Sequence, residues 1–238
     1  MSNSWVVVVH GFTGSPLSLA PQIDAFREAG FQVKVPLLPG HGTSPEDLQT
    51  KRYADWIGVV DQVVMRCVAD APVVLMGLSM GGTLVCDVLS RRHDLAGAIL
   101  VNPFVVPPDT AYRQLVATLV ASGNEYAPSI GSDIKRPGAL ETSYDRTPLL
   151  AAQSLFEGVA DVESRLGAIT TPVLLFSSEV DHVVPIESGE RLKAALGDRC
   201  DRRLLTDSFH VATLDNDATY ITEESIAFIR ARTSDAVV

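Results

Sequence analysis

The sequence has few cysteines and no recognisable cysteine pattern. Only Cys67, Cys86 and Cys200 occur among its 238 residues. An odd number of cysteines without Cys-x-x-Cys spacing does not form the disulfide framework of a secreted domain, and is typical of reduced thiols in the cytoplasm. We therefore expect a cytoplasmic location, with the three thiols buried as small apolar side chains.

Clusters of basic residues and long apolar runs are also absent. The chain has 19 Lys and Arg against 29 Asp and Glu, so its formal net charge is −10. That charge repels nucleic acid and anionic membrane surfaces. The first apolar run, Trp5–Val9, follows no Lys or Arg and is too short for a signal peptide, and no run approaches the ~18 residues of a membrane span. We expect no nucleic-acid partner and no integral membrane segment.

The composition is that of a folded globular protein. Hydrophobic residues make up 46% of the chain and charged residues 20%. A chain of this size and composition can bury a large core without disulfides or a metal. One large domain, or one domain with an insert, fits the length.

Short β-branched runs alternate with longer segments of helical period. This alternation predicts an α/β fold with a mostly parallel sheet of about six strands, flanked by helices and joined by right-handed crossovers. The predicted strands are Trp5–Val9, Phe31–Val35, Pro72–Met76, Ala98–Val101, Val173–Phe176 and Arg203–Leu205. The predicted helices lie near 17–29, 53–69, 80–92, 187–196 and 217–232.

The connection between the fourth and fifth strands is unusually long. About 70 residues separate them, too many for one crossover helix. The connection starts with several prolines and shows apolar periodicity around 110–120 and 149–160. We interpret 103–170 as a small helical cap, inserted after the fourth strand of a core formed by 1–102 and 171–238.

The third strand leads directly into Gly77-Leu78-Ser79-Met80-Gly81 and then into a helix. This G-x-S-x-G pattern is a nucleophile elbow, in which a sharp turn exposes the serine hydroxyl above the sheet. The flanking glycines are needed because a Cβ at either position would collide with neighbouring backbone. A Gly-rich turn without chemistry is the alternative, and a phosphate loop fits worse still because no Gly-Lys-Ser/Thr follows.

A serine nucleophile requires a histidine base and a carboxylate that orients the imidazole. Of the five histidines, His210 follows the last strand, at the sheet edge where reacting groups gather. We interpret His182 as a loop neighbour and His93 as a cation at a helix C-terminus.

Three acidic residues compete for the role of the orienting carboxylate. Asp181 follows the fifth strand, and its rivals are Glu179 and Asp207. We favour Asp181 because the order Ser, Asp, His along the chain is the one that this architecture uses. A solvated turn acid is the alternative interpretation.

Hydrolysis also requires backbone N–H donors for the developing oxyanion. The amide of Met80, at a helix N-terminus, is one candidate. The amide of Phe12, in the loop after the first strand, is the other, although Phe12 can equally be a core residue. The turn Pro39–Gly42 is interpreted as structural. Since no metal-ligand spacing and no G-x-G-x-x-G occur, we expect neither metal nor cofactor.

With these residues placed, nearly the whole chain resembles the α/β-hydrolase superfamily, and within it the small bacterial carboxylesterases and monoacylglycerol lipases. The matching motifs are His10–Gly14, Gly40–Gly42, Gly77–Gly82, Glu179–Pro185, Phe209–Asp215 and, in the insert, Gly131–Gly138 and Glu141–Tyr144. The resemblance implies that Glu141 helps to bind glycerol hydroxyls. It also implies a sheet that lacks the one or two strands that commonly precede Trp5–Val9.

The hypothesis is hydrolysis of carboxylic esters through an acyl-enzyme, with medium-chain monoacylglycerols as the substrate class. Leu115, Leu119, Leu149 and Leu150 would line an acyl tunnel if they face inward, although helix packing explains the same stripe. A thioesterase or a carbon–carbon bond hydrolase could use the same triad, whereas a ligand receptor or a scaffold would not need it. Dehalogenase and epoxide hydrolase chemistry is excluded because those enzymes have Asp in place of Ser79. The sequence does not define the oligomeric state.

Overall fold

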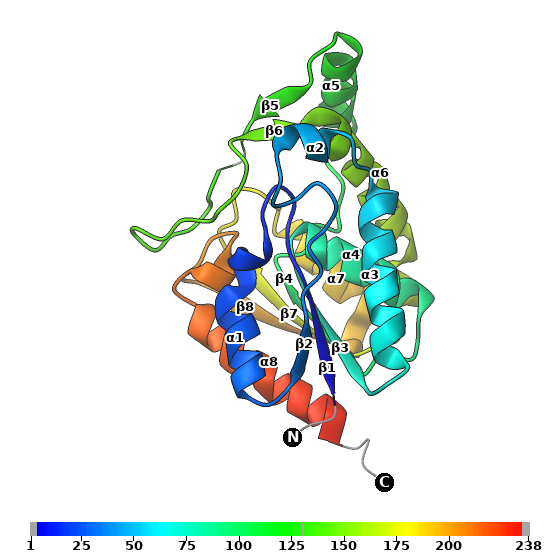
Figure 1. Ribbon diagram of the computed structural model, residues 1–238, viewed down its shortest axis with the longest axis vertical. Coiled ribbons are helices and arrows are strands. Elements are labelled where there is room, and N and C mark those ends of the chain that lie inside the picture. The colour runs from blue at the N-terminus through cyan, green and yellow to red at the C-terminus, as the bar shows by residue number, and fades with distance from the viewer. Residues whose placement is uncertain (1–3, 130, 235–238) are drawn as a thin grey trace.

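The computed structural model describes residues 4–129 and 131–234, in which a six-stranded parallel sheet forms the centre (Figure 1). Every pair of neighbouring strands is parallel. The predicted α/β fold is confirmed. In spatial order the strands are β2 (Gln32–Lys34), β1 (Trp5–Val9), β3 (Val73–Leu78), β4 (Gly97–Val101), β7 (Val173–Ser178) and β8 (Cys200–Leu205).

The central strands are continuous apolar runs because helices cover both faces of the sheet. All residues of β3, β4 and β7 are buried. The edge strand β8 is different, because Asp201, Arg202 and Arg203 are more exposed than the residues at its two ends. These charged residues explain why the last strand begins three residues earlier than predicted: an edge strand lacks the apolar run of a central one.

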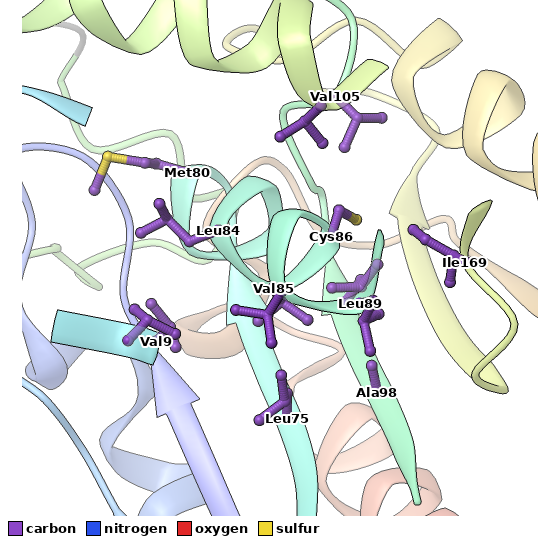
Figure 2. Close-up of a cluster of buried hydrophobic side chains, with 14 of the residues drawn as sticks. Val9, Leu75, Met80, Leu84, Val85, Cys86, Leu89, Ala98, Val105 and Ile169 are labelled. Atoms are coloured by element: carbon purple, nitrogen blue, oxygen red, sulfur yellow. The ribbon is translucent and has the colours of Figure 1, made fainter. Parts of the chain in front are cut away.

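Two layers of helices enclose the sheet (Figure 1). One face is covered by α1 (Ala20–Glu28) and α8 (Ala218–Thr233), the other by α3 (Tyr53–Val68), α4 (Met80–Arg91), α6 (Leu149–Arg165) and α7 (Glu187–Leu196). Figure 2 shows Val85 and Leu89 of α4 above Leu75 of β3 and Ala98 of β4. This packing fixes the start of α4, and with it the position of Ser79.

The predicted helices differ from the observed ones by small shifts at their ends. The segment predicted as helix 17–29 consists of a short 3-10 helix, η1 (Pro16–Leu19), followed by α1. Ser15 begins η1 by accepting the Leu17 N–H, and Pro16 occupies its first turn. At Gly197 the backbone φ is 59°, and this left-handed conformation ends α7 where glycine is favoured.

The insert between β4 and β7 contains α5 (Thr110–Ala121), β5 (Tyr126–Pro128), β6 (Arg146–Pro148) and α6. In Figure 1, α5 and the antiparallel β5–β6 pair lie above the sheet, beside the short helix α2 (Pro45–Gln49). The sequence analysis did not predict the β5–β6 pair or α2.

One helix of the insert also belongs to the main core. Leu155, Val159 and Val162 of α6 lie in the same buried cluster as α3 and α4. The division of the chain into core and cap at 103–170 therefore stays a proposal, in which α6 is shared between the two.

The three cysteines lie in the core, and the helices are those of a globular domain. Cys67, Cys86 and Cys200 are buried, as predicted, and carry free thiols in the described chain. Within residues 4–129 and 131–234, no helix is long and apolar enough to cross a membrane.

Candidate active site

Ser79 occupies a strained turn between β3 and α4. Its φ and ψ are 54° and −119°, a conformation that non-glycine residues rarely adopt. The main chain holds the turn, because the Ser79 N–H donates to the Val101 carbonyl (3.1 Å) and the Phe104 N–H donates to the Ser79 carbonyl (3.3 Å). The strain is therefore maintained by the ends of β4 and of the following loop.

The glycines around Ser79 are required by contact distances. A Cβ on Gly77 would lie 2.4 Å from the Gly81 carbonyl oxygen, and one on Gly81 would lie 2.1 Å from the Val9 carbonyl oxygen. These distances confirm the predicted collision of a Cβ at either glycine with neighbouring backbone. Gly82 has the same restriction, since its Cβ would lie 2.6 Å from the Pro103 side chain.

The His210 ring is bonded to Asp181. Its Nδ1 lies 2.8 Å from Asp181 Oδ2, and the two side chains are 8% and 3% exposed. The other carboxylate oxygen, Oδ1, accepts the N–H groups of Val183 (2.8 Å) and Val184 (2.7 Å). An ionised Asp181 can only accept, so Nδ1 carries the proton and Nε2 is left as an acceptor. This is the tautomer that a general base needs.

Ser79 follows β3 and His210 follows β8, so both lie at the carboxyl edge of the sheet, with β4 and β7 between their strands. Within the described residues, no hydrogen bond joins the Ser79 hydroxyl to the His210 ring. Such bonds are often long without substrate and shorten in the substrate complex. The end of β4 links the two loops. The Asn102 Nδ2 donates to the His210 carbonyl (2.8 Å), and the carbonyl of Val101, the preceding residue, accepts the Ser79 N–H.

The rival acids lie elsewhere. Glu179 is exposed, and Asp207 forms an ion pair with Lys135 (2.7 Å). Of the three candidates, Asp181 is the one that contacts His210.

The other histidines have separate surroundings. His93 is exposed beyond the end of α4, and its Nδ1 lies 3.0 Å from the Thr170 hydroxyl. His182 is in the loop after β7, where Nδ1 lies 2.8 Å from Asp133 and the ring packs edge-on against Phe209. His182 also lines the cavity described below. The sequence interpretation of His182 as a loop neighbour did not predict this position.

The loop after β1 lies against Ser79. A Cβ on Gly11 would be 3.5 Å from the Ser79 Cβ, so the backbone carrying Phe12 is close to the candidate nucleophile. Met80 is the first residue of α4, where backbone N–H groups have no partner within the helix. Phe12 lines the cavity and its ring packs edge-on against Trp56, while the role of its amide stays a prediction.

Two buried histidines support this loop. The Nε2 of His10 accepts the Leu38 N–H (3.2 Å), and its Nδ1 lies 2.9 Å from the Gly11 carbonyl. Burial lowers the pKa of His10 to about 4 and, together with the charge of His10, that of His41 to about 3. Both rings are therefore neutral at pH 7. Gly40 and Gly42 have φ of 80° and 69°, as in a structural turn.

A cavity of about 700 Å³ opens at Ser79 and extends beneath the insert. Its wall is mostly apolar, with Val116 from α5 and Leu149, Leu155 and Phe156 from α6. Of the four leucines considered for an acyl tunnel, Leu149 lines the cavity. Leu115 is 53% exposed and is not among the described wall residues, so the condition that it faces inward is not met. Leu119 and Leu150 are not among the described residues of the wall.

Glu141 lies in the loop between β5 and β6, beside the loop after β1. Its Oε1 accepts the Ser18 hydroxyl (2.5 Å) and would lie 3.1 Å from a Cβ on Gly14. Burial raises the pKa of Glu141. Glu141 is not among the described residues that line the 700 Å³ cavity.

Sequence reasoning missed Asn102 and Asp133. Asn102 directly follows a buried strand, a position where functional polar residues gather, so a signal for it was present. Asp133 lies within the insert and has no such signal.

A parallel sheet in this order, with a serine on a strained turn after its central strand β3, defines an α/β-hydrolase with a candidate serine nucleophile. The chain belongs to the serine aminopeptidase S33 family, whose model matches residues 2–217.

Two relatives define its class of reaction. A thermostable monoacylglycerol lipase of Bacillus sp. (strain H-257) is 35% identical over 231 residues, 94% of this chain and 89% of the relative. The solved structure of one of the metagenome-derived lipolytic enzymes LipS and LipT is 34% identical, has a TM-score of 0.89 and covers 97% of this chain and 94% of the other. With these relatives, the chain is a carboxylic ester hydrolase.

A more distant structure supports the fold alone. A monoacylglycerol lipase of Paleococcus ferrophilus has a TM-score of 0.79 at 18% identity, covering 96% of this chain and 94% of the other.

Proposed function

We propose that Ser79, His210 and Asp181 form a catalytic triad that hydrolyses esters through an acyl-enzyme. The observation that carries the proposal is the buried 2.8 Å bond between His210 and Asp181, on the same sheet edge as a strained serine that opens into the cavity. Ser79 attacks the ester carbonyl, and His210 Nε2 takes the hydroxyl proton and returns it to the leaving alcohol. Water then hydrolyses the acyl-enzyme by the same route.

In this proposal the amides of Phe12 and Met80 form the oxyanion hole. The close approach of Gly11 to Ser79 and the position of Met80 at the first turn of α4 support this assignment. A helix N-terminus also favours the negative charge that develops on the carbonyl oxygen.

We propose monoacylglycerols with medium acyl chains as the substrate class. The apolar cavity beneath the insert suits one acyl chain. The similarity to a monoacylglycerol lipase supports a glycerol leaving group, for which Glu141 is the proposed hydrogen-bonding residue. The buried free cysteines support a reducing, cytoplasmic environment.

The experiment is a comparison of the wild type and Ser79→Ala on monoacylglycerols of graded chain length, with diacyl, triacyl and thioester analogues. We expect a maximum at medium-chain monoacylglycerols and a loss of roughly 10⁴–10⁶-fold in Ser79→Ala. Less than tenfold loss would refute the nucleophile. Equal activity on all glycerides would refute the substrate class alone, and faster cleavage of thioesters would identify a thioesterase.

A further inference from the structure

One segment of the insert, Ser132–Tyr144, contacts three of the loops to which the proposed function assigns a group: those of Asp181, His210 and Phe12. We call it the bridging segment. The bridging segment includes residues 132–138 of the motif Gly131–Gly138. No residue of that motif belongs to the proposed triad or to the described wall of the cavity.

Asp133 of the bridging segment is hydrogen-bonded to two histidines, His182 of the cavity wall and His210. Its Oδ2 accepts the backbone N–H groups of His210 (3.2 Å) and His182 (3.1 Å), and its Oδ1 lies 2.8 Å from His182 Nδ1. Its own carbonyl accepts the Val211 N–H (3.0 Å). The Asp133 side chain is 12% exposed and its bond to the His210 N–H is partly buried, whereas the His182 side chain is 60% exposed, so the bonds to His182 lie at the surface.

The electrostatics of Asp133 favour its charged form. Burial acts to raise the pKa of Asp133, but hydrogen bonds from the His182 side chain and from the His182 and His210 main chains outweigh it and lower the pKa. A carboxylate that accepts several N–H groups is a strong acceptor, and it holds those groups at defined positions.

A second carboxylate fixes the same segment to the loop of His210. Asp215 is 1% exposed, and its oxygens accept the N–H groups of Phe209 (2.9 Å), Lys135 (2.7 Å) and Arg136 (2.8 Å). The N–H groups of Phe209, Lys135 and Arg136 thus share one buried acceptor, the Asp215 carboxylate. Hydrogen bonds to one buried carboxylate therefore join the bridging segment to the loop of His210.

The other end of the bridging segment reaches the loop proposed for the oxyanion hole. The Tyr144 N–H donates to the Thr13 carbonyl (3.1 Å), and the Tyr144 hydroxyl donates to the Gly40 carbonyl (2.7 Å). Glu141 accepts the Ser18 hydroxyl in the same region. A single segment thus connects the base loop with the oxyanion loop.

We propose that Asp133 is a positioning residue: by holding the main chain of His210 and of His182, it sets the direction in which the His210 ring meets Ser79. The inference rests on the proposed function. Since an error of about 1 Å in a reacting group can reduce a rate by about 100-fold, the loss of these bonds lowers the rate of the chemical step. Substrate affinity depends mainly on the apolar wall of the cavity. Asp133 is not a described wall residue, and His182 is the one wall residue among its described partners.

The test compares Asp133→Ala and Asp133→Asn with the matched control Asp145→Ala, which removes an exposed carboxylate from the same insert. The readouts are kcat and KM for a short soluble p-nitrophenyl ester, and the rate at which a serine-directed phosphonate labels the protein. We expect kcat and the labelling rate to fall together, by about 10- to 100-fold in Asp133→Ala. KM should stay within threefold, Asp133→Asn should be intermediate because it keeps one acceptor oxygen, and Asp145→Ala should match the wild type.

A folded Asp133→Ala with kcat and labelling rate within twofold of the wild type would overturn the inference, as would a rise in KM alone. If Asp133→Ala does not fold by circular dichroism, Asp133→Asn decides by the same criteria. Ser79→Ala is assayed in parallel: activity retained there refutes the proposed function itself, whereas activity lost there and kept in the Asp133 variants refutes only the positioning role.

Discussion

The two oxygens of the Asp181 carboxylate have separate partners. Oδ1 accepts the amides of Val183 and Val184, and Oδ2 faces His210 Nδ1. The amides fix the carboxylate before substrate binds, so the imidazole finds an acceptor at a set position. The orientation of His210 thus depends on a loop of three residues after Asp181.

The first prediction concerns Asp181→Asn. A carboxamide N–H in place of Oδ2 would face Nδ1, which then presents its lone pair, so the proton moves to Nε2 and the ring can no longer accept from Ser79. We expect kcat/KM to fall by about 10⁴-fold. The matched control Glu179→Gln, two residues earlier and exposed, should stay within twofold. More than a tenth of the wild-type activity in Asp181→Asn would contradict the orienting role.

A second residue-scale prediction concerns stability against pH. The pKa of buried His41 is about 3 in the folded protein, and the ordinary value is 6.5. Between these values the unfolded chain binds a proton that the folded chain does not, so stability decreases as pH falls below about 6.5. His41→Phe removes this proton and should reduce the slope of the unfolding free energy, between pH 6.5 and 4, by up to about 1.4 kcal/mol per pH unit. Urea denaturation at several pH values measures the unfolding free energy of the wild type and of His41→Phe. Equal slopes against pH in the two proteins would contradict the prediction.

The candidate site residues that could be predicted from the sequence are those that follow strand ends. Ser79, Asp181 and His210 each follow a predicted strand, and parallel strands bring their carboxyl ends to one edge. The contacts of Asp133 and Asp215 depend instead on where a long insert returns to the core. Both residues lie in motifs of the family resemblance, but neither spacing nor periodicity determines their contacts, which could be found only in three dimensions.

At the scale of elements, the crossing of α4 over β1 is the tightest junction near the site. A Cβ at Gly81 would lie 2.1 Å from the Val9 carbonyl oxygen, a rigid backbone atom. We predict that Gly81→Ala destabilises the protein by about 3 kcal/mol or more. The control is Gly58→Ala in α3, where an added Cβ meets no described atom within 4 Å and should stabilise the helix by about 0.5–1 kcal/mol. Chemical denaturation compares the two, and equal stabilities would contradict the steric account.

Buried elements were easier to predict from the sequence than exposed or short ones. Central strands such as β3 and β4 are uniform apolar runs and were located within two residues. The β5–β6 pair has only three residues on each side, and a proline in each strand removes the usual signal. Helix α2 has five residues and a single buried one, Leu48, too short for a helical period to be visible.

At the scale of the whole molecule, the three thiols report on global unfolding. Burial raises the pKa of Cys67 and Cys86, and that of Cys200 to about 11, so little thiolate is present at pH 7. We predict that a thiol reagent such as DTNB reacts slowly with the native protein and rapidly with all three cysteines in denaturant. Rapid modification of any thiol in the native state would show that the cluster around α4 opens locally.

The candidate site also depends on the whole fold, because residues 79, 181 and 210 follow three different strands, which reach one edge only when the sheet is complete. The most direct measurement is the intact mass of the native protein after treatment with a serine-directed phosphonate, followed by peptide mapping. The account predicts one adduct per chain, located on Ser79, with labelling abolished by prior denaturation and slowed by orders of magnitude in His210→Ala. An unlabelled native protein, or an adduct on a different serine, would contradict it.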